Sequence, residues 1–242
     1  LNIIKMKPGQ KFRNALKNNK PLIIPGTINA YSAKLAEIAN HNSIYLSGSG
    51  VAAASYGLPD LGVTTLENVL IDAKRITSAT SLPLLVDIDT GWGDFDAISN
   101  TIIEMGNANV AAVHIEDQIF DKRCGHRPHK QLVSIDEMQD RLKAALDAKI
   151  DDSFFIMART DALASEGIEK AIERCGKYLD VGADGIFFEA AVSIEEYKEF
   201  KNNFSAPLLA NITEFGKTPL FTQKELSDVG VDMVLYPLTA FR

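Results

Sequence analysis

The sequence contains no apolar stretch that approaches the roughly 18 consecutive residues needed to span a membrane. Cysteine is scarce, with two residues in 242, so we expect no disulfide framework and a reducing, cytoplasmic location. Positive charge is also in short supply, because 25 Lys and Arg face 32 Asp and Glu, for a net charge of -7. An acidic chain lacks the basic face that phosphate contacts need, so we expect neither a nucleic-acid nor a membrane partner.

What the sequence does contain is an ordinary globular composition, 46% hydrophobic and 24% charged, which suffices for a sizeable core. Short apolar runs recur along the chain and alternate with amphipathic helical patterns. Near-continuous apolar runs are typical of parallel strands that are covered on both faces. The predicted strands are 21–27, 43–47, 82–89, 111–117, 154–161, 185–190, 207–213 and 233–238.

Helix signals lie between these strands and complete the prediction of the fold. Eight strand–helix units in a single domain, 1–242, predict an α/β fold, a TIM-like (β/α)8 barrel. A doubly wound sheet is the alternative, but no Gly-rich nucleotide turn follows the first strand. The sequence stops at Arg242, after the eighth strand, so we expect a C-terminally incomplete domain that lacks its last outer helix. Capping-box spacing occurs at Thr64/Glu67, Ser134/Glu137, Ser193/Glu196 and Thr222/Glu225.

Polar residues gather at the C-terminal ends of the predicted strands, where (β/α)8 barrels carry their functional groups. Several of them alternate with a spacing of two, which places both members of a pair on one face of a strand. Burying so many polar groups is costly unless they meet a ligand, a metal ion or each other. A hydrogen-bonded structural layer would explain one or two pairs, so we interpret the set as a site. Its members are Tyr45, Ser47, Asp87, Asp89, His114, Glu116, Arg159, Asp161, Glu189, Asn211 and Thr213.

Two aspartates at the end of the third strand are the strongest candidates for a metal site. Asp87 and Asp89 supply hard oxygen ligands, and Asp60 and Glu116 are further carboxylates that could support them. Oxygen ligands without soft ones favour Mg2+ or Mn2+, with water completing the coordination. A zinc site is not expected, because no Cys/His ligand spacing is present.

A basic loop, residues 122–127, follows the fourth strand and reads Lys-Arg-Cys-Gly-His-Arg. Most charge runs are solvated loops, but this one holds Cys124 beside a glycine. Cationic neighbours favour the thiolate and make Cys124 a candidate proton donor or nucleophile. Cys175 lies in an apolar helical stripe and is typical of a buried residue. After the second strand, the Ser-Gly-Ser-Gly turn at 47–50 offers hydroxyl and N–H groups for a carboxylate.

Taken together, these motifs resemble the isocitrate lyase/phosphoenolpyruvate mutase superfamily in its lyase branch, and within it the 2-methylisocitrate lyase family. The signature KRCGH occupies residues 122–126, and the resemblance covers nearly the whole chain. Further matching stretches are YLSGSGVAAASYGLPDLG from Tyr45, LPLLVDIDTGWG from Leu82, HIEDQ from His114, IMARTDALA from Ile156, LLANITEFGKTPLF from Leu208 and LYPLTAFR from Leu235.

The resemblance implies a Mg2+-dependent lyase that cleaves 2-methylisocitrate, a tricarboxylate, to pyruvate and succinate in the methylcitrate cycle of propionate catabolism. It implies a homotetramer that exchanges its outer helices between subunits. Metal binding would fall to Asp87 and Asp89, assisted by Asp60 and Glu116. The implied catalytic residues are Cys124 as the acid, Tyr45 as a candidate base, Lys122 and His126. The implied substrate contacts are Ser47, Gly48, Ser49, Gly125, Arg159, Glu189, Asn211, Ile212, Thr213 and Arg242.

Alternatives and departures from the family remain. The chain could act on isocitrate or oxaloacetate, or bind a carboxylate without turnover, since the C-terminal segment of family members, with a further substrate Arg, does not occur in it. Phe188 stands where the family usually has Pro, beside Glu189. Phe187, Leu235 and Pro237 match the family pattern that leaves room for the substrate's methyl group.

Overall fold

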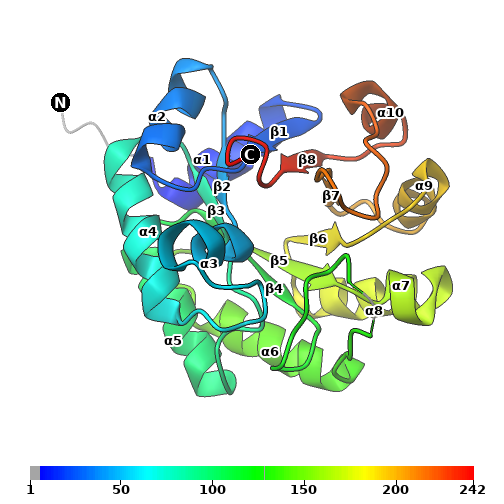
Figure 1. Ribbon diagram of the computed structural model, residues 1–242. Coiled ribbons are helices and arrows are strands. Elements are labelled where there is room, and N and C mark those ends of the chain that lie inside the picture. The colour runs from blue at the N-terminus through cyan, green and yellow to red at the C-terminus, as the bar shows by residue number, and fades with distance from the viewer. Residues whose placement is uncertain (1–5, 128) are drawn as a thin grey trace.

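The computed structural model describes residues 6–127 and 129–242, so residues 1–5 and 128 of the predicted domain lie outside it. Eight parallel strands form one sheet in the order β1-β8-β7-β6-β5-β4-β3-β2, and the helices lie around them (Figure 1). The strands are β1 (Leu22–Pro25), β2 (Ile44–Leu46), β3 (Leu84–Asp87), β4 (Ala112–Glu116), β5 (Phe155–Thr160), β6 (Gly185–Phe188), β7 (Leu208–Asn211) and β8 (Met233–Tyr236).

The ring closes between β1 and β2 through a short junction. Gly26 forms a parallel bridge with Tyr45, and the N–H of Thr27 donates to the Tyr45 carbonyl at 2.7 Å. The predicted (β/α)8 barrel is therefore confirmed, and all eight observed strands lie inside the predicted apolar runs. After β8 the described chain forms a turn that reaches Arg242.

Ten helices in the described residues surround this ring. None of the helices in residues 6–127 and 129–242 is both long and apolar enough to cross a bilayer. The helices are α1 (Pro8–Asn18), α2 (Ala30–Ile38), α3 (Gly48–Tyr56), α4 (Leu66–Ala79), α5 (Phe95–Asn107), α6 (Ile135–Asp147), α7 (Leu163–Glu166), α8 (Ile168–Val181), α9 (Ile194–Asn203) and α10 (Gln223–Asp228).

The helix caps follow the sequence signals with two differences. Ser193 and Thr222 form complete capping boxes with Glu196 and Glu225. Ser134 caps α6, but the Glu137 carboxylate bonds to an arginine of the same helix instead of closing the box. The prediction of Thr64 as a cap is wrong by one residue. Thr65 caps α4, because Asn68 is placed to exchange both hydrogen bonds with it.

Two apolar cores hold the strands in place. The outer core lies between strands and helices, and the inner core fills the barrel with residues such as Leu85, Met157 and Leu209. The ring of Phe12, on α1, is fully buried in the inner core, 5.1 Å from the ring of Phe155 at the start of β5. Helix α1 therefore covers the N-terminal end of the barrel, and the polar strand ends lie at the opposite end.

Candidate active site

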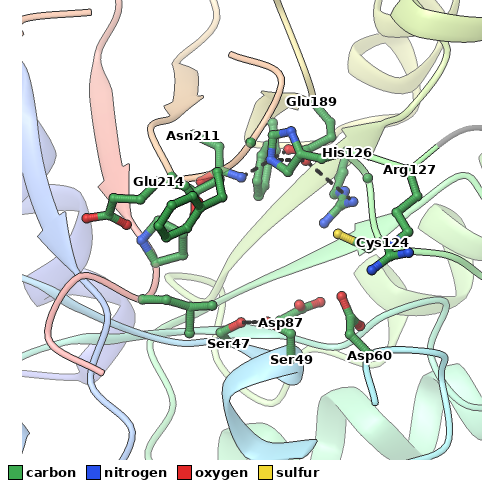
Figure 2. Close-up of a pocket in the computed structure, with 18 of the residues that line it drawn as sticks. Ser47, Ser49, Asp60, Asp87, Cys124, His126, Arg127, Glu189, Asn211 and Glu214 are labelled. Atoms are coloured by element: carbon green, nitrogen blue, oxygen red, sulfur yellow. Dashed lines mark hydrogen bonds and ion pairs between the residues drawn. The ribbon is translucent and has the colours of Figure 1, made fainter. Parts of the chain in front are cut away.

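A cavity of about 440 Å³ opens at the C-terminal ends of the strands. Figure 2 shows Ser47, Ser49 and Asp60 along one side and Asn211, Glu189 and His126 along the other, with the Cys124 sulfur between the two sides. The predicted site residues that line it are Tyr45, Ser47, Ser49, Asp60, Asp87, Lys122, Cys124, Gly125, His126, Arg159, Glu189, Asn211, Thr213 and Arg242.

A buried ammonium group lies among the predicted metal ligands. Lys122 Nζ is 2.7 Å from Asp60 Oδ1 and 2.7 Å from Asp89 Oδ1. The Asp87 carboxylate accepts from the N–H of Gly48 at 3.2 Å and from the N–H of Asp89 at 3.0 Å. Asp89 lies beyond the end of β3 with a positive φ of 47°, so the strand alternation predicted for the pair does not extend to it.

Burial raises the pKa of two of the predicted metal ligands, Asp89 and Glu116. It raises the pKa of Asp89 to about 6, against the opposing charge of Lys122. Burial also raises the pKa of Glu116 well above its ordinary value, against the opposing charge of Arg159. Neither Glu116 oxygen accepts a hydrogen bond from the described part of the chain. Buried carboxylates without donors are what a cation and its water ligands would satisfy.

The carboxylates nevertheless do not form a ready-made cage. Within the described residues, no three His, Cys, Asp or Glu side chains converge closely enough to hold a metal ion by themselves. Mg2+ tolerates such an arrangement, because it commonly keeps several waters and takes only one or two protein carboxylates. The all-oxygen donor set and the Glu116 oxygens, which accept no hydrogen bond from the described residues, therefore fit Mg2+.

Arg159, at the end of β5, is the central cation of the cavity wall. Its Nε lies 3.0 Å from Asp161 Oδ2 and 3.3 Å from Glu116 Oε2. Its guanidinium also lies over the ring of Phe187, 5.1 Å from the centroid. These partners fix the guanidinium plane, and a fixed guanidinium suits bidentate recognition of a carboxylate.

The charges close to the Cys124 thiol in space differ from the charges of the residues beside it in the sequence. Burial raises the pKa of the thiol, and the charges of Asp60 and Glu189 raise it further, while Arg159 opposes them. The raised pKa favours the protonated thiol, whereas the basic neighbours in the sequence would by themselves favour the thiolate. The ammonium of Lys122, two residues before Cys124, is paired with the carboxylates of Asp60 and Asp89. A protonated thiol is the form that a general acid needs.

Tyr45 pairs with His114, another member of the predicted polar set. The Tyr45 hydroxyl lies 3.0 Å from His114 Nε2, and the two rings stack with centroids 5.8 Å apart. Burial lowers the pKa of His114 to about 4, so the ring is neutral at pH 7 and can accept the Tyr45 proton in a hydrogen bond. His114 Nδ1 lies 3.8 Å from Asp87 Oδ1, so this pair continues toward the carboxylates.

The remaining predicted contacts divide into two groups. Asn211 Nδ2 donates to Glu189 Oε2 at 3.3 Å, and His126 Nε2 lies 3.2 Å from Glu189 Oε1 on the cavity wall. Gly48, Asp89, Glu116 and Ile212 do not border the cavity. Gly48 supports Asp87 from behind, and the Ile212 side chain packs in the outer core, so its predicted substrate contact could come only from its backbone.

Five cavity residues escaped the sequence analysis as site residues: Arg127, Glu214, Phe215, Gly216 and Leu238. Glu214 engages Arg242, whose Nη1 donates to the Glu214 carbonyl at 2.6 Å and lies 3.1 Å from Oε2. Arg242 also lies over the Phe215 ring at 5.0 Å. Arg127 belongs to the basic loop, but position within a loop gives no sign of which cation faces inward. Phe188, the departure from the family, packs toward Phe200 on α9 in the outer core.

Comparison with known proteins agrees with this architecture. The family model of phosphoenolpyruvate phosphomutase matches residues 12–242, and the chain belongs to that family. Among solved structures, a 2,3-dimethylmalate lyase is 34% identical, with a TM-score of 0.92 over 98% of this chain and 80% of that one. An oxaloacetate acetylhydrolase with 3,3-difluorooxalacetate is 34% identical, with a TM-score of 0.93 over 97% of this chain and 81% of that one. A phosphonopyruvate hydrolase with oxalate and Mg2+ is 29% identical, with a TM-score of 0.83 over 96% and 81%.

Curated relatives narrow the family further. The 2-methylisocitrate lyase of Shewanella oneidensis is 60% identical over 234 residues, which cover 97% of this chain and 80% of the relative. The 2-methylisocitrate lyase of Escherichia coli K12 is 55% identical over 237 residues, again 97% and 80%. Within the phosphoenolpyruvate phosphomutase family, this chain groups with the 2-methylisocitrate lyases.

Proposed function

We propose that this protein cleaves 2-methylisocitrate to pyruvate and succinate, as a carbon–carbon lyase. The observation that carries the proposal is that the Cys124 thiol and the Asp87 carboxylate border the same cavity. The identity with curated 2-methylisocitrate lyases supports this substrate over others of the family. A cavity of about 440 Å³ is within the range of small-ligand sites.

Carboxylate binding falls to polar groups from several strand ends. Arg159 is the fixed cation, and Asn211 and Thr213 supply further polar groups from β7 and the residues after it. Ser47 and Ser49 line the cavity at the N-terminus of α3, and their hydroxyl oxygens are 2.9 Å apart. A helix N-terminus favours negative charge, so these groups suit an anionic substrate.

Mg2+ is the proposed cofactor, held by Asp87 and Asp89 with Asp60 and Glu116 supporting them, in part through water. When bound, it would lower the pKa of the substrate's hydroxyl group and neutralise charge on the adjacent carboxylate. The related hydrolase with oxalate and Mg2+ supports this proposal. Isothermal titration with MgCl2 on the parental protein and on Asp87→Asn tests it without activity, and equal heats from both would contradict it.

The proton transfers fall to two residues of the cavity wall. Tyr45 is the proposed base: as the carbon–carbon bond breaks, its oxygen takes the substrate's hydroxyl proton while its own proton passes to Nε2 of the neutral His114, 3.0 Å away. The bonding electrons pass to the succinate fragment as a carbanion next to its carboxylate. The Cys124 thiol then gives its proton to that carbon. On one side of the loop, Lys122 binds the carboxylates of Asp60 and Asp89. On the other side, His126 contacts the carboxylate of Glu189.

A pyruvate-release assay tests the proposal directly. The protein is incubated with 2-methylisocitrate, isocitrate or oxaloacetate, with and without Mg2+, and pyruvate and the other products are quantified. We expect Mg2+-dependent release of pyruvate and succinate in equal amounts, fastest from 2-methylisocitrate. Faster turnover of isocitrate or oxaloacetate would assign another substrate of the family. Succinate-induced thermal stabilisation without turnover of any of the three would indicate a silent carboxylate-binding protein.

Assembly and cellular role follow from the same proposal. We propose a homotetramer in the cytoplasm that serves propionate catabolism through the methylcitrate cycle. Light scattering coupled to gel filtration tests the tetramer, and a monomeric mass at micromolar concentration would contradict it.

A further inference from the structure

Lys130 is a buried cation that does not line the cavity. Its side chain is only 2% exposed, and its ammonium donates to the Gly125 carbonyl at 2.7 Å and to Asp161 Oδ1 at 2.8 Å. A buried ammonium needs such partners, since an unpaired charge in the interior is costly. Lys130 therefore connects the backbone of the loop that carries Cys124 to the end of β5.

Asp161 is a fixed anchor for this connection. Its side chain is fully buried, and it accepts hydrogen bonds from Arg159 Nε at 3.0 Å and Nη2 at 3.3 Å. Its backbone N–H donates to Asp117 Oδ1 at 2.9 Å. The chain of contacts from Lys130 through Asp161 to Arg159 thus ties the loop to the central cation of the cavity wall.

Besides the side-chain contacts of Lys122 and His126, two side chains outside 122–127 hold the backbone of the loop, one on each side of Cys124. On the N-terminal side, the Gln118 amide exchanges two hydrogen bonds with the backbone of Arg123, at 2.9 and 3.0 Å. On the C-terminal side, Lys130 holds the Gly125 carbonyl. The backbone at Gly125 lies so close to Arg159 that a side chain at this position would overlap the Arg159 guanidinium.

We propose that Lys130 is a positioning residue that clamps the loop 124–126 onto Asp161 and so holds the Cys124 thiol beside Arg159. It touches no reacting atom, and it acts on catalysis through the position of the Gly125 peptide. Without the ammonium, the Gly125 carbonyl loses its donor and Asp161 loses a cation, so the loop is free to leave β5. This assignment goes beyond the proposed reaction and does not depend on the identity of the substrate.

Alkylation of Cys124 by iodoacetamide reports the position of the loop. Cys175 is fully buried, so only Cys124 reacts readily in the folded protein. In Lys130→Met, which keeps an unbranched apolar chain, we expect labelling about tenfold faster because the loop opens more often. Loss of a positive charge alone would favour the neutral thiol and slow labelling, so the sign separates a clamp from an electrostatic role. Lys143→Met is the matched control, because Lys143 is a 59% exposed lysine of α6.

Turnover gives the second readout. We expect kcat of Lys130→Met to fall about 100-fold through misplacement of the thiol, with a smaller change in KM. Lys130→Gln, whose amide can still donate to the Gly125 carbonyl, should be intermediate in both labelling and kcat, and it replaces the Met variant if circular dichroism shows that variant unfolded. Labelling rates of both variants within twofold of Lys143→Met would overturn the clamp, whatever the turnover. Because labelling needs no substrate, that failure is distinct from a wrong substrate assignment.

Discussion

Replacing Gly125 with alanine should displace the Cys124 loop without removing any catalytic side chain. A Cβ at this position would lie 2.5 Å from Arg159 Nη2 and closer still to Glu189 Oε1, whereas ordinary contact begins at 3.4 Å. Neither neighbour can yield freely, because Arg159 is held by Asp161 and the Glu189 carboxylate is bonded on the cavity wall. The loop must therefore move by about 1 Å, and a displacement of that size at a reacting group costs about 100-fold in rate.

Pyruvate release under saturating substrate and Mg2+ measures the effect. A 100-fold loss in kcat corresponds to about 2.7 kcal/mol in the activation free energy. Gly176→Ala is the control, because its Cβ would lie 3.3 Å from the ring of Phe204 on the outside of the barrel and alanine favours the helix. Parental kcat in a correctly folded Gly125→Ala would refute the reasoning, since it would mean that Arg159 and Glu189 absorb the added methyl group without moving the thiol.

Three other outcomes test separate parts of the structure. Cys124→Ser should keep its thermal midpoint and Mg2+ binding but lose about 100- to 10,000-fold in kcat, and parental turnover would dismiss the thiol as the acid. Iodoacetamide labelling of Cys124 should reach half its maximal rate above pH about 8.5, because burial raises the thiol pKa; a midpoint below that value would reveal a stabilised thiolate. Phe12→Ala should lower the free energy of unfolding by about 3–5 kcal/mol in urea denaturation. Its kcat should stay within twofold of the parental value, since Phe12 lies at the far end of the barrel, and a larger loss would show that α1 influences the site.

Six of the eight strands are buried at every position, which leaves an apolar run that can be read directly, and β1 and β8 keep partly exposed positions within theirs. The helix caps were less predictable, because several adjacent polar residues can often serve as the cap. Thr64 and Thr65 are adjacent, and Thr65 caps the helix because Asn68 exchanges both hydrogen bonds with it; the Thr64 carbonyl accepts from Trp92 Nε1 at 2.9 Å.

The membership of the cavity was also predictable, but its pairings were not. Alternation along a strand indicates which residues share a face, so most of the predicted polar set reached the cavity. It says nothing of partners on other strands, so the contact of Tyr45 on β2 with His114 on β4 was missed. Ile212 came from the resemblance alone, and its side chain faces the helices because it follows Asn211, whose side chain faces the cavity.

The charge state of Cys124 depends on which charges are close in space. Along the chain the thiol has lysine, arginine and histidine neighbours, and these would favour the thiolate. In the fold, the Lys122 ammonium turns away to Asp60 and Asp89, which bind it at 2.7 Å each. Glu189 and Asp60 then act on the sulfur together with burial, and the pKa rises. The carboxylates proposed to hold Mg2+ therefore also bind the Lys122 ammonium, and the raised pKa keeps a proton on Cys124, the proposed acid.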